Sequence, residues 1–182
     1  MVNRRNVIAI VAVFSCIRIS LWAQDLHKGS DMEDCPMHTQ HNTTNHHEAM
    51  LEHGDKVMGF SHDTTTHHFR LLAEGGAVEV TANDAKDGDD VKAVQSHLSH
   101  IANAFKQGDF ATPMAVHDEL PPGVTSMKLL QSKIQYQLEE LPAGARLLMR
   151  SDDPVAVAAI QDFLRYQIRE HRTGDSETVP SR

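Results

Sequence analysis

A weak internal repeat is the feature that most restricts the fold. Residues 94–109 (VQSHLSHIANAFKQGD) recur as residues 160–175 (IQDFLRYQIREHRTGD), with the same Gln, Leu, Gly and Asp at equivalent positions. In both copies the apolar residues recur at the spacing of an amphipathic helix. Each copy ends in Gly-Asp, where a glycine can take the left-handed conformation that closes a helix. The sequence therefore predicts two related helices in one domain.

Two predicted β-hairpins precede these helices. Apolar and polar residues alternate on both sides of two turns, Glu-Gly-Gly and Pro-Ala-Gly, in residues 66–72 with 77–82 and 133–140 with 145–150. The chain thus divides into two ββα repeats, 66–108 and 133–174. Such repeats predict an α+β fold in which a four-stranded, mainly antiparallel sheet carries both helices on one face. The repeat implies a pseudo-twofold axis, and a homodimer would give an equally good packing.

The segment that joins the repeats is rich in proline. Pro113, Pro121 and Pro122 exclude a long helix there, although Pro122 can open a short one that runs to about Gln131. In the first repeat, Asp89 or Asp90 is expected to cap a helix that begins at Val91.

The first 23 residues have the pattern of a secretory signal. Arg4 and Arg5 precede the apolar run 7–17, which is too short to span a bilayer comfortably, and Ala23 is a small residue at a cleavage position. We expect residues 1–23 to be removed and the mature protein to reside in the periplasm or to be secreted. A lipoprotein processing site, with a lipid anchor at Cys16, is the alternative.

The expected mature chain is acidic and has one cysteine. Removal of the signal takes away three arginines and no acidic residue, so the formal charge changes from −8 to −11. A protein this acidic repels nucleic acid and attracts cations. With Cys16 removed, Cys35 has no internal disulfide partner, which leaves it as a reactive thiol, an intermolecular disulfide partner or a metal ligand.

Residues 24–57 are rich in histidine and methionine and have almost no apolar periodicity. Nine of the thirteen histidines lie between His27 and His68. This composition predicts a flexible arm, with a short helix at most around 48–53, because it buries too little apolar surface to offset the entropy of ordering. Imidazole suits copper, zinc and nickel, whereas thioether and thiolate select Cu(I). The candidate metal ligands in the arm are Cys35, Met37, His38, His41, His46 and His47.

The expected folded domain, residues 58–175, places other histidines at or beside core positions. His97 and His100 lie on one flank of the first helix, at a spacing at which two imidazoles can share an ion. His171 occupies a core position that the first copy of the repeat fills with Phe105. His67 lies on the core face of the first predicted hairpin.

A methionine and a histidine in the proline-rich linker add two donors. Met114 and His117 are three residues apart, and Asp118 is placed to orient a histidine. The ordinary alternatives are that Met114 fills the core and that the histidine pair on the first helix, His97 and His100, is simply solvated. The hypothesis of a shared metal site between sheet, helices and linker rests on His67, His97, His100, His117, His171 and Met114.

These features favour an exported metal chaperone, buffer or resistance factor, with copper ahead of zinc or nickel. Its partners would be metal ions and an unidentified metal-transport protein, and not nucleic acid. The alternative is an enzyme in which a bound metal activates water or a histidine acts as general base. A further alternative is a haem protein, with haem held non-covalently because the chain lacks Cys-x-x-Cys-His. Residues 176–182 are expected to be a disordered tail.

Several short motifs together resemble a family of small exported bacterial proteins of unestablished function. They are Met58-Gly59-Phe60, His62, TTHHF at 65–69, Pro113-Met114, His117-Asp118 and Pro121-Pro122-Gly123. The resemblance covers about residues 58–175. Members are sometimes labelled aspartate carbamoyltransferase, an enzyme that is a much longer two-domain protein with a Ser-Thr-Arg-Thr phosphate loop. Thr64–Thr66 has neither the arginine nor a following helix, so the sequence does not predict that activity.

Overall fold

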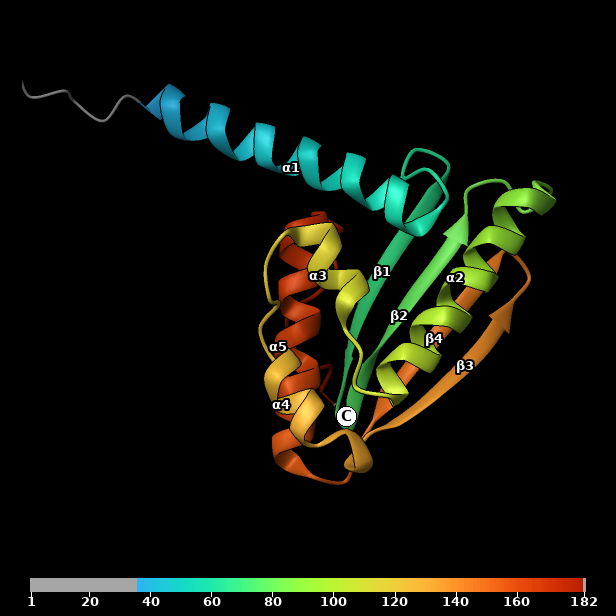
Figure 1. Ribbon diagram of the computed structural model, residues 1–182, viewed down its shortest axis with the longest axis vertical. Helices are drawn as coiled ribbons and strands as arrows, with labels where there is room; N and C mark the ends of the chain where they lie inside the picture. The colour runs from blue at the N-terminus through green and yellow to red at the C-terminus, as the bar shows by residue number, and fades with distance from the viewer. Residues whose placement is uncertain (1–35, 182) are drawn as a thin grey trace, which may run out of the picture. The chain divides into compact units, whose positions relative to one another are not determined.

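The structure, a computed structural model, describes the backbone of residues 36–181 and the side chains of residues 47–181 (Figure 1). Its main helices are α1 (Pro36–Met58), α2 (Gly88–Lys106), α3 (Ala111–His117), α4 (Val124–Leu129) and α5 (Pro154–His171). A short 3-10 turn, Gln131–Lys133, precedes the second hairpin. The strands are β1 (Thr65–Leu72), β2 (Gly75–Ala82), β3 (Gln135–Leu141) and β4 (Gly144–Arg150).

The four strands form one antiparallel sheet in the order β1-β2-β4-β3. The two hairpins meet at the central pair β2 and β4, where Val80 lies opposite Ala145 and Val78 opposite Leu147. The helices α2 and α5 lie on the same face of this sheet (Figure 1). The predicted α+β class, the four-stranded sheet and the two ββα units are therefore confirmed.

Each main helix covers the hairpin of the other repeat. The first-repeat helix α2 packs chiefly on β4 and β3, whereas the second-repeat helix α5 packs on β1 and β2. One core cluster accordingly contains Phe69 of β1, Phe105 of α2, Leu147 of β4 and Leu164 of α5. Because each helix packs mainly on the hairpin of the other repeat, the two halves share one core.

Local capping sets where the helices begin. Asp87, not Asp89 or Asp90, accepts hydrogen bonds from the backbone N–H groups of residues 89 and 90, so α2 begins at Gly88 rather than Val91. In the second repeat Asp153 caps α5 and Pro154 takes its first position, as the sequence predicts.

The segment expected to be a flexible arm is helical over its described part. Residues 36–57 belong to α1, which packs on α3 and α5 and buries Met50 to 3% exposure. The physical reason is a sparse stripe at four-residue spacing, Met50, Gly54 and Met58, that composition alone does not reveal. The expected signal, with Cys16, and residues 24–35 of the expected arm lie outside the described residues.

The end of the chain is also more ordered than its composition predicts. Asp175 accepts hydrogen bonds from the Phe69 N–H at 2.9 Å and from His68 Nδ1 at 3.0 Å. Arg169 pairs with Glu177 at 2.6 Å, and Val179 packs against the core. Residues 176–182 were expected to be disordered, but in the structure the segment is held to α5 through Glu177 and to the core through Val179.

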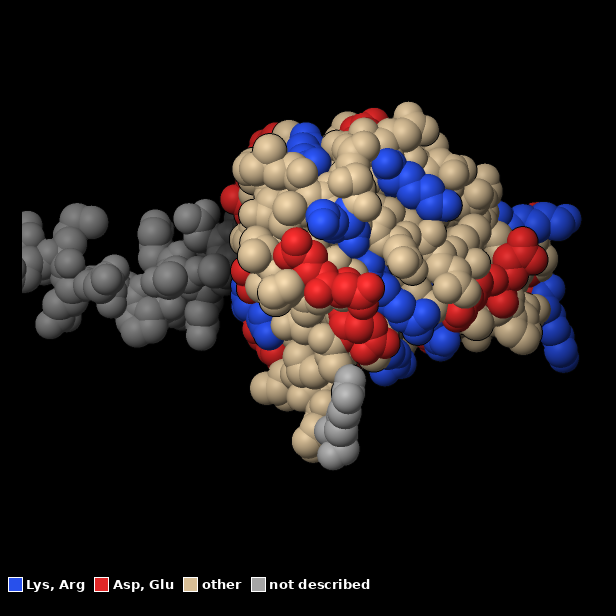
Figure 2. Space-filling view, turned by 90° about the horizontal axis from the view of Figure 1, so that it is seen from below, with Lys and Arg blue, Asp and Glu red and all other residues tan. Residues whose placement is uncertain are grey.

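Charged side chains of both signs share the molecular surface. Figure 2 shows Lys and Arg beside Asp and Glu on the face seen from below the view of Figure 1. On the sheet, Arg146 donates to Glu79 at 2.6 Å and lies 3.5 Å from Glu139. Within the described part of the chain, no helix has the length and apolar character needed to cross a membrane.

Candidate functional site

Two adjoining hollows lie where α1, α5 and the sheet meet, and they share Met58, His67 and His171. The first, here called the apolar cavity, has a volume of about 70 Å³ and is lined mainly by aliphatic and aromatic side chains. The second, here called the histidine cleft, has about 300 Å³. The histidines that line the cleft are His47, His62, His67, His68 and His171. Residues from distant parts of the sequence thus converge on one region.

The imidazoles of His67 and His171 form the centre of this region. They stack at a centroid distance of 5.6 Å with their planes 15° apart, and His117 meets His171 edge-on at 5.2 Å. Phe69 lies 5.4 Å from His171 and supports its ring from the sheet. His171 of α5 therefore contacts two other predicted site histidines, His67 of β1 and His117 of α3.

Burial keeps these imidazoles neutral. Burial, together with the nearby His97, lowers the pKa of His67 from 6.5 to about 4. The pKa of His171 lies well below its usual value, first because the ring is buried and then because His67 and His117 are close. A neutral imidazole has a free nitrogen lone pair, which is the form that binds a metal ion.

The predicted pair on α2 is divided between interior and solvent. His97 lines the apolar cavity and meets Phe60 edge-on at 5.4 Å, and burial lowers its pKa to about 4. Phe60 in turn stacks on His67 at 6.1 Å, so it bridges the two histidines. His100 is exposed, because its position lies beyond the edge of the helix face that Phe60 covers.

The linker residues are divided in the same way. His117 is buried to 4% exposure, and its Nε2–H donates to Gln167 Oε1 at 3.0 Å. Met114, at 36% exposure, lines neither hollow. Asp118 is exposed and ends α3 in a left-handed conformation, with φ of 53°. The two residues, three apart at the end of α3, thus differ in burial: His117 is interior, and Met114 is exposed.

Of the ligands predicted in the arm, one has a described side chain. His47 donates from Nδ1 to the Glu170 carbonyl at 3.0 Å and lines the histidine cleft. It also contributes to the lowered pKa of His171. The side chains of the other arm candidates, Cys35, Met37, His38, His41 and His46, lie outside the described residues.

Two carboxylates fix histidines at the rim of the cleft. Both oxygens of Asp55 lie 3.0 Å from His62 Nδ1, and one also accepts the His62 backbone N–H at 2.8 Å. Asp175 holds His68 from the C-terminal side. Burial alone would raise the pKa of Asp175, but hydrogen bonds from Phe69, Thr173 and His68 lower it below its usual value. The rim histidines are therefore already oriented, whereas the central ones are held by packing.

Sequence reasoning missed three residues of this site. Met58 lines both hollows, Gln167 lines the apolar cavity with 4% exposure, and Phe60 joins two histidines. The amide Nε2 of Gln167 has no hydrogen-bond partner among the described residues. The four-residue spacing of Met50, Gly54 and Met58 is a signal by which Met58 was detectable.

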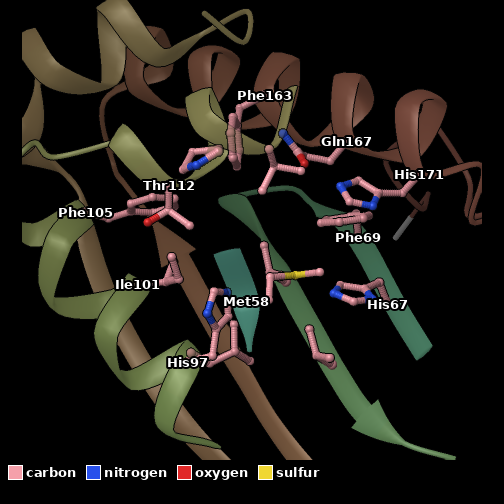
Figure 3. A pocket seen from close by; sticks show the side chains of 15 residues that line it. Met58, His67, Phe69, His97, Ile101, Phe105, Thr112, Phe163, Gln167 and His171 are labelled. Atoms are coloured by element: carbon pink, nitrogen blue, oxygen red, sulfur yellow. The ribbon is translucent and has the colours of Figure 1, made fainter. Parts of the chain in front are cut away.

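The site is a convergence of donors and not a completed coordination sphere. Among residues 47–181, no three His, Cys, Asp or Glu side chains are already arranged to hold one ion. Figure 3 shows the labelled imidazoles of His67, His97 and His171 and the thioether of Met58 around the same cavity. Comparison of the chain with protein-family models, with curated proteins and with solved structures finds no match.

Proposed function

We propose that this chain is an exported metal-binding protein, with copper ahead of zinc or nickel, that serves as a chaperone, buffer or resistance factor. The observation that carries the proposal is the convergence of imidazoles from α1, β1, α2 and α5 on two adjoining hollows, with His117 of α3 in contact with His171. A core that served packing alone would fill these positions with Phe or Leu, as the repeat does at Phe105 and Phe163.

The residues proposed to hold the ion are His67, His97 and His171, with Met58 beside them. His117 contacts His171 and is proposed to position it, because its own Nε2–H is engaged by Gln167. Because the rings of His67 and His171 are stacked rather than aimed at one point, binding includes their rotation about the side-chain torsions. His47, His62 and His68 line the cleft and are proposed as capture groups.

The linings of the two hollows support a transition metal over calcium or magnesium. No Asp or Glu is among the residues that line the apolar cavity or the histidine cleft. Calcium and magnesium require several oxygen ligands, whereas neutral nitrogen and sulfur donors suit copper, zinc and nickel. Export, which is proposed from the signal-like residues 1–23, would place such a protein where copper is handled outside the cytoplasm.

The test is metal titration of the full chain after chelator treatment. Copper, zinc and nickel are added in separate titrations while NMR follows the ring signals of the histidines. His67, His97 and His171 are expected to respond together, and His171→Phe is expected to weaken that response at least tenfold. His100→Gln, on the exposed side of α2, is the matched control. Ring signals that stay unchanged with all three metals would refute the proposed function.

A further inference from the structure

Met58 occupies a position that metal binding by histidine alone does not explain. It ends α1, is one of the three residues common to both hollows, and packs against the cluster that contains Phe60 and Leu98. In the view of Figure 3 its thioether lies between the imidazoles of His67 and His97, which line the same cavity. A soft sulfur donor thus lies among neutral nitrogen donors.

No charged side chain lines the apolar cavity around this sulfur, and the Asp55 carboxylate that acts on His67 from outside the lining is engaged by His62. The rest of the apolar cavity consists of residues such as Val80, Ile101 and Phe163, with Thr112 and Gln167 as its uncharged polar members. The free energy needed to bring an ion from water into such surroundings rises with the square of its charge. Without a carboxylate in the cavity lining to compensate, a divalent ion therefore incurs a much larger penalty here than a monovalent one.

The donor chemistry leads to the same class of ion. Thioether sulfur is a soft ligand that selects Cu(I), whereas zinc sites in proteins take thiolate, imidazole or carboxylate. The room beside Met58 is also specific, because a Cβ placed on Gly54 would lie 3.1 Å from the Met58 Cε. Glycine at this helical position leaves space for the methionine methyl group.

We propose that the apolar cavity binds a soft monovalent ion, Cu(I), through the thioether of Met58 together with imidazoles of His67, His97 and His171. This inference rests on the proposed function. It restricts the bound ion from transition metals in general to a monovalent ion, and it adds a thioether to the ligands. It assigns Met58 as a ligand and distinguishes the cavity from the rim of the cleft, where carboxylates orient His62 and His68.

The experiment uses the full chain with 13C-labelled methionine methyl groups and silver(I), a redox-inert probe for Cu(I), in chloride-free buffer. Met58 is assigned by the methyl signal that disappears in Met58→Leu, so methionines of the N-terminal region are read separately. The Met58 signal is expected to shift with Ag(I) and to stay in place with Zn(II). In Met58→Leu, the Ag(I) response of the His67 and His171 ring signals should weaken at least tenfold.

Met127→Leu is the matched control, because Met127 is fully buried in the core and lines neither hollow. It should bind Ag(I) like the parent chain. If the histidine rings respond to metal while the Met58 methyl does not, or if Zn(II) shifts Met58 as Ag(I) does, the inference fails and metal binding stands. If neither rings nor methyl respond to any metal, the proposed function fails as well.

Discussion

His67 and His171 stack face to face, with ring centroids 5.6 Å apart, although one lies in the first strand and the other in the last helix. Protonation of both rings would put two cations in contact inside the protein, so the stack requires that at least one ring stay neutral. The packing of β1 against the end of α5 should therefore weaken at acidic pH.

We expect the metal-free protein to lose stability as the pH falls from about 6.5 towards 4. In that interval the unfolded chain binds protons that the folded chain excludes, because the folded pKa of His67 is about 4 against 6.5 when exposed. Above pH 6.5 both states are neutral and the effect is absent. The total loss is on the order of a few kcal/mol, since one pKa unit corresponds to about 1.4 kcal/mol. Urea unfolding of chelator-treated protein at several pH values measures it.

A matched pair of α2 variants tests the origin of this acid sensitivity. His97→Phe, which copies the Phe163 of the second repeat, should reduce the dependence because the pKa of His97 is also lowered to about 4. His100→Gln should change it much less, because burial lowers the pKa of His97 more than the neighbouring His100 does. Equal pH dependence in both variants and the parent would contradict the assignment to buried imidazoles.

His171→Phe is expected to separate stability from metal binding. It introduces the residue that the first repeat carries as Phe105, beside the aromatic ring of Phe69, 5.4 Å from His171. The metal-free variant should be more stable than the parent near pH 5, because one buried base no longer has to remain neutral. Its metal affinity should fall at least tenfold. Thermal unfolding at two pH values, with and without copper, measures both effects, and a variant that keeps full affinity would exclude His171 as a ligand.

Asp175 and Asp109 are twins in the repeat with different tasks. Asp175 accepts from the Phe69 N–H and from His68, whereas Asp109 accepts from the N–H of Ala111, two residues on in the sequence. Asp175→Asn should therefore cost about 1.5–3 kcal/mol, the range for a hydrogen bond to a charged group, and Asp109→Asn less. Hydrogen exchange at the Phe69 amide should speed up in the first variant and stay slow in the second. Equal exchange rates in the two variants would show that the hydrogen bonds of Asp175 do not protect β1.

The fold was predictable because each level of the sequence agrees with the next. Period-two alternation, glycine turns and the repeated amphipathic helix all indicate two ββα units, and the sheet follows from them. The sequence did not reveal that α2 covers the opposite hairpin, because a helix with one apolar stripe fits either hairpin equally well. The packing of α1 on the domain could not be predicted from its polar composition, because it depends on only a few spaced positions, Met50, Gly54 and Met58.

The candidate site was predictable in part for the same reason. His171 and His67 occupy core-facing positions of regular elements, where the period fixes the direction of a side chain. His100 and Met114 lie at the margins of their helices, where a rotation of a few tens of degrees decides between cavity and solvent. Gln167 joins the site through tertiary packing, for which local periodicity carries no information, whereas the spacing of Met50, Gly54 and Met58 was a weak signal for Met58.

The hydrogen bond between His117 and Gln167 should couple their contributions to stability. Gln167→Leu removes the acceptor for the buried His117 Nε2–H, 3.0 Å away, and should cost about 1–3 kcal/mol, the usual penalty for an unpaired buried donor. His117→Phe with Gln167→Leu should cost less than the sum of the single changes. Urea unfolding of the four proteins gives the coupling free energy, and additive values would indicate two independent packing effects.

Gly54→Ala tests whether the position of Met58 matters for metal binding. Alanine in the interior of a helix usually stabilises by about 0.5–1 kcal/mol relative to glycine. Here the new Cβ would lie 3.1 Å from Met58 Cε, so the end of the methionine side chain must shift by a few tenths of an ångström. Affinity for Ag(I) at the cavity should fall several-fold. Gly88→Ala is the control, because a Cβ there meets nothing within 4 Å and leaves Met58 in place. Equal Ag(I) affinity in the two variants would show that a displaced Met58 does not weaken binding. Met58 would then not be a ligand.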